Sequence, residues 1–196
     1  MADLRDALEA LERGLPIVIP TDTVYGLAAR FDLPGAVRTL FDVKGRPEQK
    51  ALPVLGAARE QLAELAVFTR DADALAERFW PGALTLVLAR RRGFTYDLGG
   101  EGDDTVAVRV PSNEATLELL RLSGPLAVTS ANLSGQPPCA TAGDARAALG
   151  DAVAVYVDGG ESRGSPSTVV ALVNGIEVLR EGAVSEGELR SALSLS

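Results

Sequence analysis

Four short segments carry the side chains best suited to bind a polar, anionic substrate: PTDTVYG at 20–26, KGRPEQK at 44–50, TSANLSG at 129–135 and SPST at 165–168. Each adjoins an apolar run that predicts a buried strand. The ends of such strands are where α/β proteins build their ligand sites. We therefore expect the four segments to meet in one site.

The basic segment places Lys44, Arg46 and Lys50 within seven residues of an otherwise acidic chain. Arginine offers planar paired donors to a phosphate and lysine offers a compact charge, so Lys44 and Arg46 on either side of Gly45 can converge on phosphate oxygens. The order of glycine, lysine and Ser/Thr that defines a Walker A loop is missing. Taken alone, this segment is better explained as a solvated basic loop.

The other three segments are rich in hydroxyl and amide groups. The hydroxyls at 20–26 can hydrogen-bond a small polar ligand, and TSANLSG can present backbone amides to an anion. SPST leads into a strand whose expected hairpin partner carries Arg180, so hydroxyls and a cation can share one face. Each segment alone also fits an ordinary polar turn.

The composition excludes several kinds of chemistry. The chain has no histidine, which removes Ser-His-Asp and Cys-His catalysis and every imidazole metal site. The single cysteine, Cys139, can form neither an internal disulfide nor a zinc site by itself. A net charge of -8 disfavours nonspecific attraction to nucleic acid or anionic membranes, so an anion site must be a local basic patch.

Length and composition predict one domain over residues 1–196, since 196 residues with 46% hydrophobic content can fill a single core. We see neither an apolar run long enough to span a membrane nor the apolar stretch of a secretory signal. We therefore expect a cytoplasmic protein without a membrane partner.

The apolar pattern alternates between helical and strand periods. It predicts helices over 2–13, 35–42, 57–66 and 70–79, and another that begins at Ser112 and ends near Gly124. It predicts strands over 17–19, 52–55, 84–88, 105–110 and 126–129. Asn174-Gly175 predicts a hairpin between 168–173 and 176–179, and Ser185 with Glu188 predicts the capping box of a last helix. The sheet should therefore be mixed.

Together these segments resemble the YrdC-type domain of the threonylcarbamoyl-AMP synthase family. The resemblance rests on PTDTVYGL at 20–27, KGRP at 44–47, FWPGALTLVL at 79–88, TVAVRVP at 105–111, TSANLSG at 129–135 and STVV at 167–170. It implies an α/β fold with a twisted mixed sheet, flanking helices and a large concave ligand cavity. It also implies a nucleotidyltransferase that makes L-threonylcarbamoyl-AMP from L-threonine, bicarbonate or CO2, and ATP, for the threonylcarbamoyladenosine modification of tRNA.

The resemblance also implies roles for individual residues. Those matching the nucleotide-binding positions are Lys44, Arg46, Thr105, Ser130, Asn132, Ser167, Thr168 and Arg180. Thr23 and Arg109 match the threonine-binding positions, with Arg109 as the partner of the substrate carboxylate. Alternation within Val106–Val110 directs Arg109 away from the face of the valines and toward the expected cavity.

The implied chemistry needs no covalent enzyme intermediate. Adenylate formation can proceed by positioning and charge stabilisation, for which Lys44 and Arg46 are the expected catalytic cations. The sequence offers no dedicated carboxylate cage for a metal, so the expected Mg²⁺ would be held mainly by the ATP phosphates and water. A downstream tRNA threonylcarbamoyl transferase would consume the product.

Three positions depart from longer members of the family. Lys50 stands where many carry Asn, Leu55 where many carry a threonine-contacting His, and Pro138 where many carry Ser. These departures concern mainly the threonine pocket. The chain resembles the short form of the family, without the additional C-terminal domain of the longer members.

Two alternative functions remain open at this stage. One is a carbamoyl-adenylate-forming enzyme, like the YrdC-type domain of hydrogenase-maturation carbamoyltransferases. The other is a noncatalytic RNA-binding module of the same fold, for which Arg90, Arg91 and Arg92 could supply a weak local phosphate contact. The net charge of -8 argues against RNA binding as the main role.

Overall fold

The computed structural model describes residues 4–45, 51–100, 104–162 and 165–194. Its helices are α1 (Leu4–Glu12), α2 (Ala36–Lys44), α3 (Arg59–Leu62), α4 (Arg70–Phe79), α5 (Glu114–Ser123), α6 (Ala142–Leu149), the 3-10 turn η1 (Gly150–Ala152) and α7 (Glu186–Ser194). Its strands are β1 (Ile17–Ile19), β2 (Gly26–Ala29), β3 (Val54–Leu55), β4 (Leu84–Ala89), β5 (Thr105–Arg109), β6 (Leu126–Ser130), β7 (Val155–Tyr156), β8 (Thr168–Ala171) and β9 (Glu177–Arg180). The mixed α/β class expected from the sequence is confirmed.

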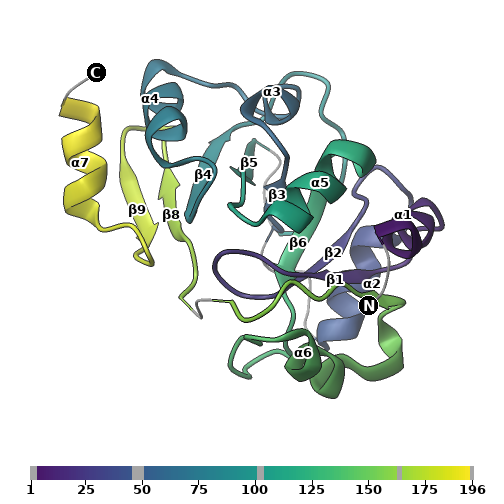
Figure 1. Cartoon of the computed structure of the whole chain (residues 1–196). Coiled ribbons are helices and arrows are strands. Elements are labelled where there is room, and N and C mark those ends of the chain that lie inside the picture. Colours follow the sequence, from purple (N-terminus) through teal and green to yellow (C-terminus); the bar gives the residue numbers. More distant parts are fainter. Residues whose placement is uncertain (1–3, 46–50, 101–103, 163–164, 195–196) are drawn as a thin grey trace.

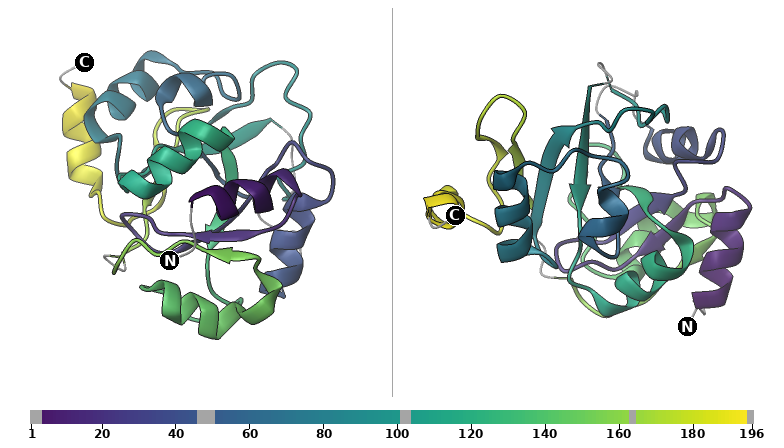
Figure 2. Two further views of the ribbon diagram at one scale, coloured as in Figure 1. Left: turned by 45° about the vertical axis from the view of Figure 1, so that its right-hand side comes forward. Right: turned by 90° about the horizontal axis from the view of Figure 1, so that it is seen from above.

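The strands form one sheet in the order β7-β1-β2-β6-β3-β5-β4-β8-β9. The pairs β1–β7, β3–β5 and β4–β8 are parallel, and the other neighbouring pairs are antiparallel. The sheet is twisted, and helices α1 and α7 lie at opposite ends of the molecule (Figures 1 and 2). This order brings segments that are far apart in the sequence onto neighbouring strands.

Most predicted elements form close to their expected places. The helix expected over 57–66 is limited to α3. Helix α5 begins one residue later than expected, because Asn113 and not Ser112 is the N-cap, with its side chain accepting a hydrogen bond from the Thr116 amide. The capping box of α7 is confirmed, since the Ser185 amide and hydroxyl both donate to Glu188.

Four elements were not predicted: β2, α6, η1 and β7. Helix α6 begins with a capping box formed by Thr141 and Asp144. Strand β2 is short and begins at Gly26, the last residue of the polar PTDTVYG motif, so no separate apolar run marked it. A Cβ on Gly26 would lie 2.7 Å from Cγ1 of Val128, so a glycine lets β2 approach β6 closely and places the 20–26 segment next to Ser130.

The predicted hairpin forms between β8 and β9, but its turn differs from a two-residue type I′ turn. Gly175 has a positive φ of 98°, whereas Asn174 does not have a positive φ. A type I′ turn needs positive φ at both central residues, so Asn174-Gly175 does not form one. The connection between the two strands instead covers residues 172–176. The hairpin remains, and it carries Arg180 back toward the sheet.

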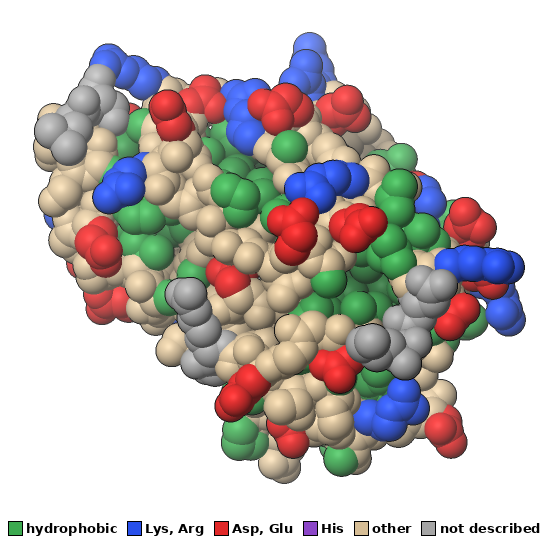
Figure 3. Space-filling model, viewed as in Figure 1, with side chains coloured by type: hydrophobic (Ala, Val, Ile, Leu, Met, Phe, Trp, Pro, Cys, Tyr) green, Lys and Arg blue, Asp and Glu red, His purple; other side chains and the backbone are tan. Residues whose placement is uncertain are grey.

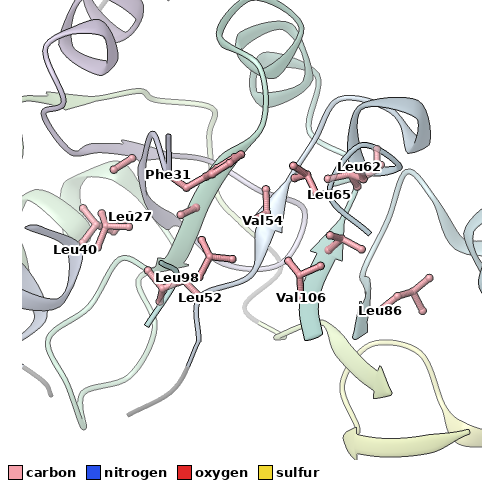
Figure 4. Packing of buried hydrophobic residues seen from close by; sticks show 14 of the residues in the cluster. Leu27, Phe31, Leu40, Leu52, Val54, Leu62, Leu65, Leu86, Leu98 and Val106 are labelled. Atoms are coloured by element: carbon pink, nitrogen blue, oxygen red, sulfur yellow. The ribbon is translucent and has the colours of Figure 1, made fainter. Parts of the chain in front are cut away.

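The core divides into two clusters of buried side chains. The larger contains Val54, Val106 and Leu86 from neighbouring strands, together with Leu62 from α3 (Figure 4). The smaller contains strand residues such as Leu55 and Val128, packed against α1 and α5. Val106, Val108 and Val110 all belong to the larger cluster, which confirms that they share a face and that Arg109 points elsewhere.

The surface carries mixed charges. On the face shown in Figure 3, acidic and basic side chains are interspersed and hydrophobic side chains lie between them. Among the described residues, no helix has both the length and the apolar content needed to cross a bilayer.

Candidate active site

Three of the four predicted segments line a single cavity of about 310 Å³. Its polar lining residues are Thr21, Thr23, Thr85, Arg109, Thr129, Ser130, Ser167 and Arg180. A larger hollow of about 770 Å³ adjoins it and shares Thr21, but contains neither of these two arginines. The smaller cavity is therefore the better candidate for an anion-binding site, because two cations and several hydroxyl groups converge there.

Arg109 is 5% exposed and is held by three groups. Its Nε donates to the Gly82 carbonyl oxygen at 2.8 Å, its Nη1 to Thr23 Oγ1 at 2.9 Å and its Nη2 to Asp22 Oδ1 at 2.7 Å. Asp22 Oδ1 also accepts the Ser112 amide. A guanidinium carries five N–H donors, so two remain for a ligand after these three bonds.

The threonine hydroxyls beside Arg109 form a small network. Thr21 Oγ1 accepts the amides of Thr23 and Val24 and lies 2.6 Å from the Val24 carbonyl oxygen. It also lies 2.9 Å from Thr23 Oγ1, and either hydroxyl can be the donor in that bond. Thr23 Oγ1 accepts from Arg109, so it keeps one acceptor site when it donates to Thr21 and one hydrogen when Thr21 donates to it. Thr23 can therefore accept a hydrogen from a ligand or donate one to it.

Arg180 lies near a second pair of hydroxyls. Its Nε and Nη2 donate to the Ser167 carbonyl oxygen at 3.1 and 2.9 Å, and its Nη2 approaches Ser167 Oγ at 3.3 Å. Ser167 Oγ is in turn 2.9 Å from Thr85 Oγ1. Among the described residues, no acidic side chain forms an ion pair with Arg180. Its positive charge therefore remains available to an anion.

The two arginines influence each other. Burial lowers the pKa of Arg109, Asp22 raises it and the charge of Arg180 lowers it. Burial also lowers the pKa of Arg180. Like charges held near one another in a partly enclosed space favour an anionic ligand, because the ligand relieves both their repulsion and their loss of hydration.

Lys44 is 4% exposed and faces the 129–135 segment. Its Nζ donates to the carbonyl oxygens of Ser130 at 2.5 Å and Asn132 at 2.7 Å, and lies 3.4 Å from Ser130 Oγ. It does not line the cavity. The cation therefore holds the loop that supplies Ser130, and its contact with a phosphate stays a prediction.

Asn132 is 7% exposed and also lies behind the cavity lining. Its Nδ2 donates to the carbonyl oxygens of Leu133 and Gln136. Its Oδ1 is buried and has no hydrogen-bond partner within the described ranges. A buried acceptor without a donor costs free energy, so a water or ligand donor is expected at this oxygen.

Two other expected nucleotide contacts do not line the cavity. The Thr168 hydroxyl donates to the Val184 carbonyl oxygen and accepts the amides of Gly182 and Val184, so its hydrogen-bonding capacity is used inside the protein. These bonds tie β8 to residues 182–184, and the nucleotide contact expected of Thr168 stays a prediction. Thr105 stands at the start of β5, on the same face as Arg109 but four residues away.

Two of the three residues that depart from longer family members are among the described residues. These two, Leu55 and Pro138, both line the cavity. Leu55 pairs with Arg109 across β3 and β5, so their side chains are neighbours on one face. Arg46 and Lys50 lie outside the described residues.

Asp22, Tyr25 and Thr85 are among the residues of the cavity region to which sequence reasoning assigned no individual role. The Tyr25 hydroxyl donates to the Gly160 carbonyl oxygen at 2.6 Å and accepts the Gly159 amide. Tyr25 and Asp22 lie inside the PTDTVYG motif, whose hydroxyls were expected to contact a ligand as a group. Thr85 could have been found as the one polar residue in the apolar strand LTLVLA.

The described residues contain no group of three or more Cys, Asp or Glu side chains that could hold a metal ion. Asp22, the acidic partner of Arg109, is already bonded to Arg109 and the Ser112 amide. The described side chains therefore do not form a resident magnesium site.

Comparisons with known proteins agree with this architecture. The model of the Sua5/YciO/YrdC family, described as "Telomere recombination", matches residues 9–182. A protein of Mycobacterium tuberculosis (strain ATCC 25618 / H37Rv) is 41% identical over 192 residues, which cover 96% of this chain and 88% of that protein. The threonylcarbamoyl-AMP synthase of Pyrococcus abyssi (strain GE5 / Orsay) is 39% identical over 97% of this chain and 57% of its own length.

Solved structures show the same similarity. The crystal structure of P. abyssi Sua5 complexed with L-threonine superposes with a TM-score of 0.89 at 37% identity, over 97% of this chain and 57% of that one. The crystal structure of E. coli YciO superposes with a TM-score of 0.86 at 25% identity, over 95% of this chain and 92% of that one. The chain thus spans little more than half of the Pyrococcus protein and nearly all of YciO.

Proposed function

This chain belongs to the Sua5/YciO/YrdC family, and on that premise we propose that it makes L-threonylcarbamoyl-AMP from L-threonine, bicarbonate or CO2, and ATP, releasing pyrophosphate. The observation that carries the proposal is the cavity in which Arg109 and Arg180 converge with threonine and serine hydroxyls. Its chemistry suits substrates with a carboxylate and phosphates. The relatives named threonylcarbamoyl-AMP synthase support this choice of substrates.

Threonine would bind beside Arg109. Its carboxylate would take the two N–H donors that Arg109 keeps after bonding Gly82, Thr23 and Asp22. Its amine would lie beside the Thr23 hydroxyl, which accepts a hydrogen from it when Thr23 donates to Thr21. This contact would orient the neutral amine for its attack on CO2. The P. abyssi Sua5 complex with L-threonine supports this substrate.

ATP would bind beside Arg180, with phosphate oxygens facing the guanidinium and the Ser167 hydroxyl. Ser130 lines the cavity and would contact the nucleotide directly, while Lys44 and Asn132 shape the loop behind it. We keep Lys44 and Arg46 as the proposed catalytic cations, and Thr105 and Thr168 as proposed nucleotide contacts. Mg²⁺ would arrive with ATP, as part of the substrate.

The reaction balances without a covalent enzyme intermediate. The threonine nitrogen attacks the carbon of CO2 and loses a proton, giving a carbamate. A carbamate oxygen then attacks the α-phosphorus of ATP, and the bond from that phosphorus to the bridging oxygen breaks to release pyrophosphate. The protein's part is to orient the two substrates and stabilise the phosphate charge, as in other electrostatic catalysis.

A single assay tests this function. Purified protein is incubated with ATP, Mg²⁺, bicarbonate and threonine, and pyrophosphate and threonylcarbamoyl-AMP are measured by mass spectrometry. We expect both products only when threonine and bicarbonate are present together. Equal pyrophosphate release without threonine would instead indicate a carbamoyl-adenylate-forming enzyme. Binding of RNA without either product would indicate the noncatalytic module.

Lys44 provides a variant for the same assay. Lys44→Ala should lower turnover about a hundredfold or more, the effect expected when a charge-stabilising group is lost. Its burial gives a structural reason as well, since two carbonyl oxygens of the 129–135 loop lose their donor. Arg5→Ala, which removes an exposed cation of α1, is the control and should keep full turnover. Near-normal turnover of Lys44→Ala would reject a catalytic or loop-holding role.

The cellular setting follows from the proposed product. A threonylcarbamoyl adenylate is consumed by a transferase that acts on tRNA, and we propose a cytoplasmic location with such a partner. Direct RNA contact through Arg90–Arg92 has little support. The guanidinium of Arg90 donates to the Thr105 carbonyl oxygen and that of Arg91 to the Ala63 carbonyl oxygen, so two of the three arginines bind the protein's own main chain.

A further inference from the structure

Thr85 is a buried polar residue that the proposed mechanism does not use. Strand β4 is otherwise apolar, and Leu84, Leu86 and Leu88 alternate into the larger core cluster. Thr85 points to the other face, is 4% exposed and lines the cavity. Burying a hydroxyl where an isosteric valine would fit costs free energy unless the hydroxyl is hydrogen-bonded. The one side-chain partner that Thr85 has among the described residues is Ser167.

The main chain at Ser167 is held without Thr85. Arg180 donates twice to the Ser167 carbonyl oxygen, and Thr168 binds the segment 182–184 through its hydroxyl. Gly182 packs so closely that an added Cβ would lie 2.7 Å from the Ser167 carbonyl carbon. The bond from Thr85 therefore adds little to the position of this segment. What it controls is the direction of the Ser167 hydroxyl.

The hydroxyl hydrogens of Thr85 and Ser167 determine which of the two residues can donate to a ligand. Two hydroxyls carry two hydrogens, and the bond between Thr85 and Ser167 uses one of them. The other is left to donate into the cavity that both residues line. Among the described residues, Arg180 hydrogen-bonds to Ser167 and not to Thr85, so an oxyanion at the guanidinium lies beside Ser167. Ser167 is then the donor to that oxyanion, and Thr85 is the donor to Ser167.

We propose that Thr85 is a positioning residue, which sets Ser167 Oγ as a hydrogen-bond donor to a substrate oxyanion held by Arg180. The proposal rests on the proposed function for the identity of the substrates, but the donor site itself does not depend on turnover.

Calorimetry and kinetics on three variants test this role. Thr85→Val removes the hydroxyl with little change of shape, Thr85→Ser restores it, and Thr39→Val removes a hydroxyl on α2 outside the cavity. The dissociation constants of ATP, pyrophosphate and threonine are measured directly, and the KM of bicarbonate is measured by turnover. These arms separate a phosphate, a carbonate and a carboxylate as the source of the oxyanion.

We expect Thr85→Val to weaken one of these substrate classes about tenfold, the size of one hydrogen bond to a charged group, while the others change less than about twofold. Thr85→Ser should recover most of the loss, and Thr39→Val should bind as the parent protein does. The unfolding temperature of Thr85→Val should change by only about 2 °C, because valine fills the same space.

Three results would overturn the proposal: unchanged affinity for every substrate, equal weakening of all of them, or a serine variant no better than the valine variant. The test is independent of the proposed reaction. If the parent protein binds ATP or pyrophosphate in a Thr85-dependent way but makes no threonylcarbamoyl-AMP, the proposed function fails and the positioning role of Thr85 stands.

Discussion

Arg109 and Arg180 line the same cavity, but the protein compensates their charges differently. Arg109 is buried and bonded to the carboxylate of Asp22, with further bonds to Thr23 and Gly82. Arg180 keeps part of its surface exposed and binds the main chain of Ser167, with no acidic partner among the described residues. The first arrangement suits a ligand group that must be held in one orientation. The second suits an anion whose charge matters more than its exact direction.

The difference agrees with the substrates we propose. A carboxylate at Arg109 meets a guanidinium whose plane is already set by three partners, so binding costs little reorganisation. A phosphate at Arg180 meets a cation with an unneutralised charge, so Coulomb attraction is the larger contribution there. The cavity therefore combines a rigid arginine for the amino acid with a more exposed arginine for the nucleotide.

The strongest test of this comparison is Arg109→Lys. Lysine keeps the charge but cannot make paired parallel bonds to a carboxylate or replace the bonds to Gly82 and Thr23. We expect threonine use to weaken about a hundredfold and ATP affinity to stay within about twofold. Steady-state kinetics with threonine and calorimetry with ATP measure the two effects. Unchanged threonine dependence, or an equal loss of ATP binding, would remove Arg109 from this role.

Asp22→Asn tests whether the buried pair is structural as well. Removal of the carboxylate charge leaves Arg109 buried without its counter-ion, which should lower the free energy of unfolding by about 3 kcal/mol. Asp73→Asn is the matched control, because its pair with Arg59 is largely exposed and should contribute less than about 1 kcal/mol. Urea denaturation measures both variants. Equal destabilisation by the two would contradict the special status of the Arg109 pair.

Arg180→Ala should affect the two substrates in the opposite order to Arg109→Lys. We expect ATP affinity to fall about tenfold through loss of an unneutralised cation, and threonine affinity to change little. The unfolding temperature should fall only slightly, since hydrogen bonds to Ser167 are lost but no described ion pair is broken. Calorimetry and thermal unfolding measure these effects. A greater loss of threonine affinity than of ATP affinity would show that the two arginines have been assigned the wrong way round.

A higher salt concentration should produce the smallest difference between ATP binding and threonine binding. Exposed charges are screened by added ions and buried pairs are screened much less. When KCl is raised from about 0.05 M to about 0.5 M, the dissociation constant of ATP should rise severalfold and that of threonine less than about twofold. Calorimetry at constant Mg²⁺ separates the two. Equal salt dependence would mean that both arginines are equally open to solvent.

Much of the fold was readable from local patterns, and each success has a local cause. Apolar runs predicted β1, β4 and β6 because a buried strand needs consecutive residues that tolerate the core. Ser185 and Glu188 predicted the start of α7 because a capping box is made within one turn. Strand β2 was not predicted because its four residues, GLAA, overlap the end of a polar motif and form no distinct apolar run. Its partner β6 also lies far away in the sequence.

The site was predictable in its residue types and less so in its contacts. The motifs correctly selected Thr23, Arg109, Ser130, Ser167 and Arg180 as residues that share one cavity. Alternation along β5 also gave the direction of Arg109, since side chains of one strand alternate whatever its neighbours are. The roles of these residues in binding remain proposals that the variants above will test.

The sequence by itself determined which short elements form and which side chains are available to them, because capping, turn chemistry and periodicity act over a few residues. Only the tertiary structure decided that Asp22 neutralises Arg109, that Lys44 holds the carbonyl oxygens of the 129–135 loop and that Thr85 meets Ser167. Each of these contacts joins residues more than eighty positions apart. They depend on strand order and register, and these are set by the packing of the whole sheet.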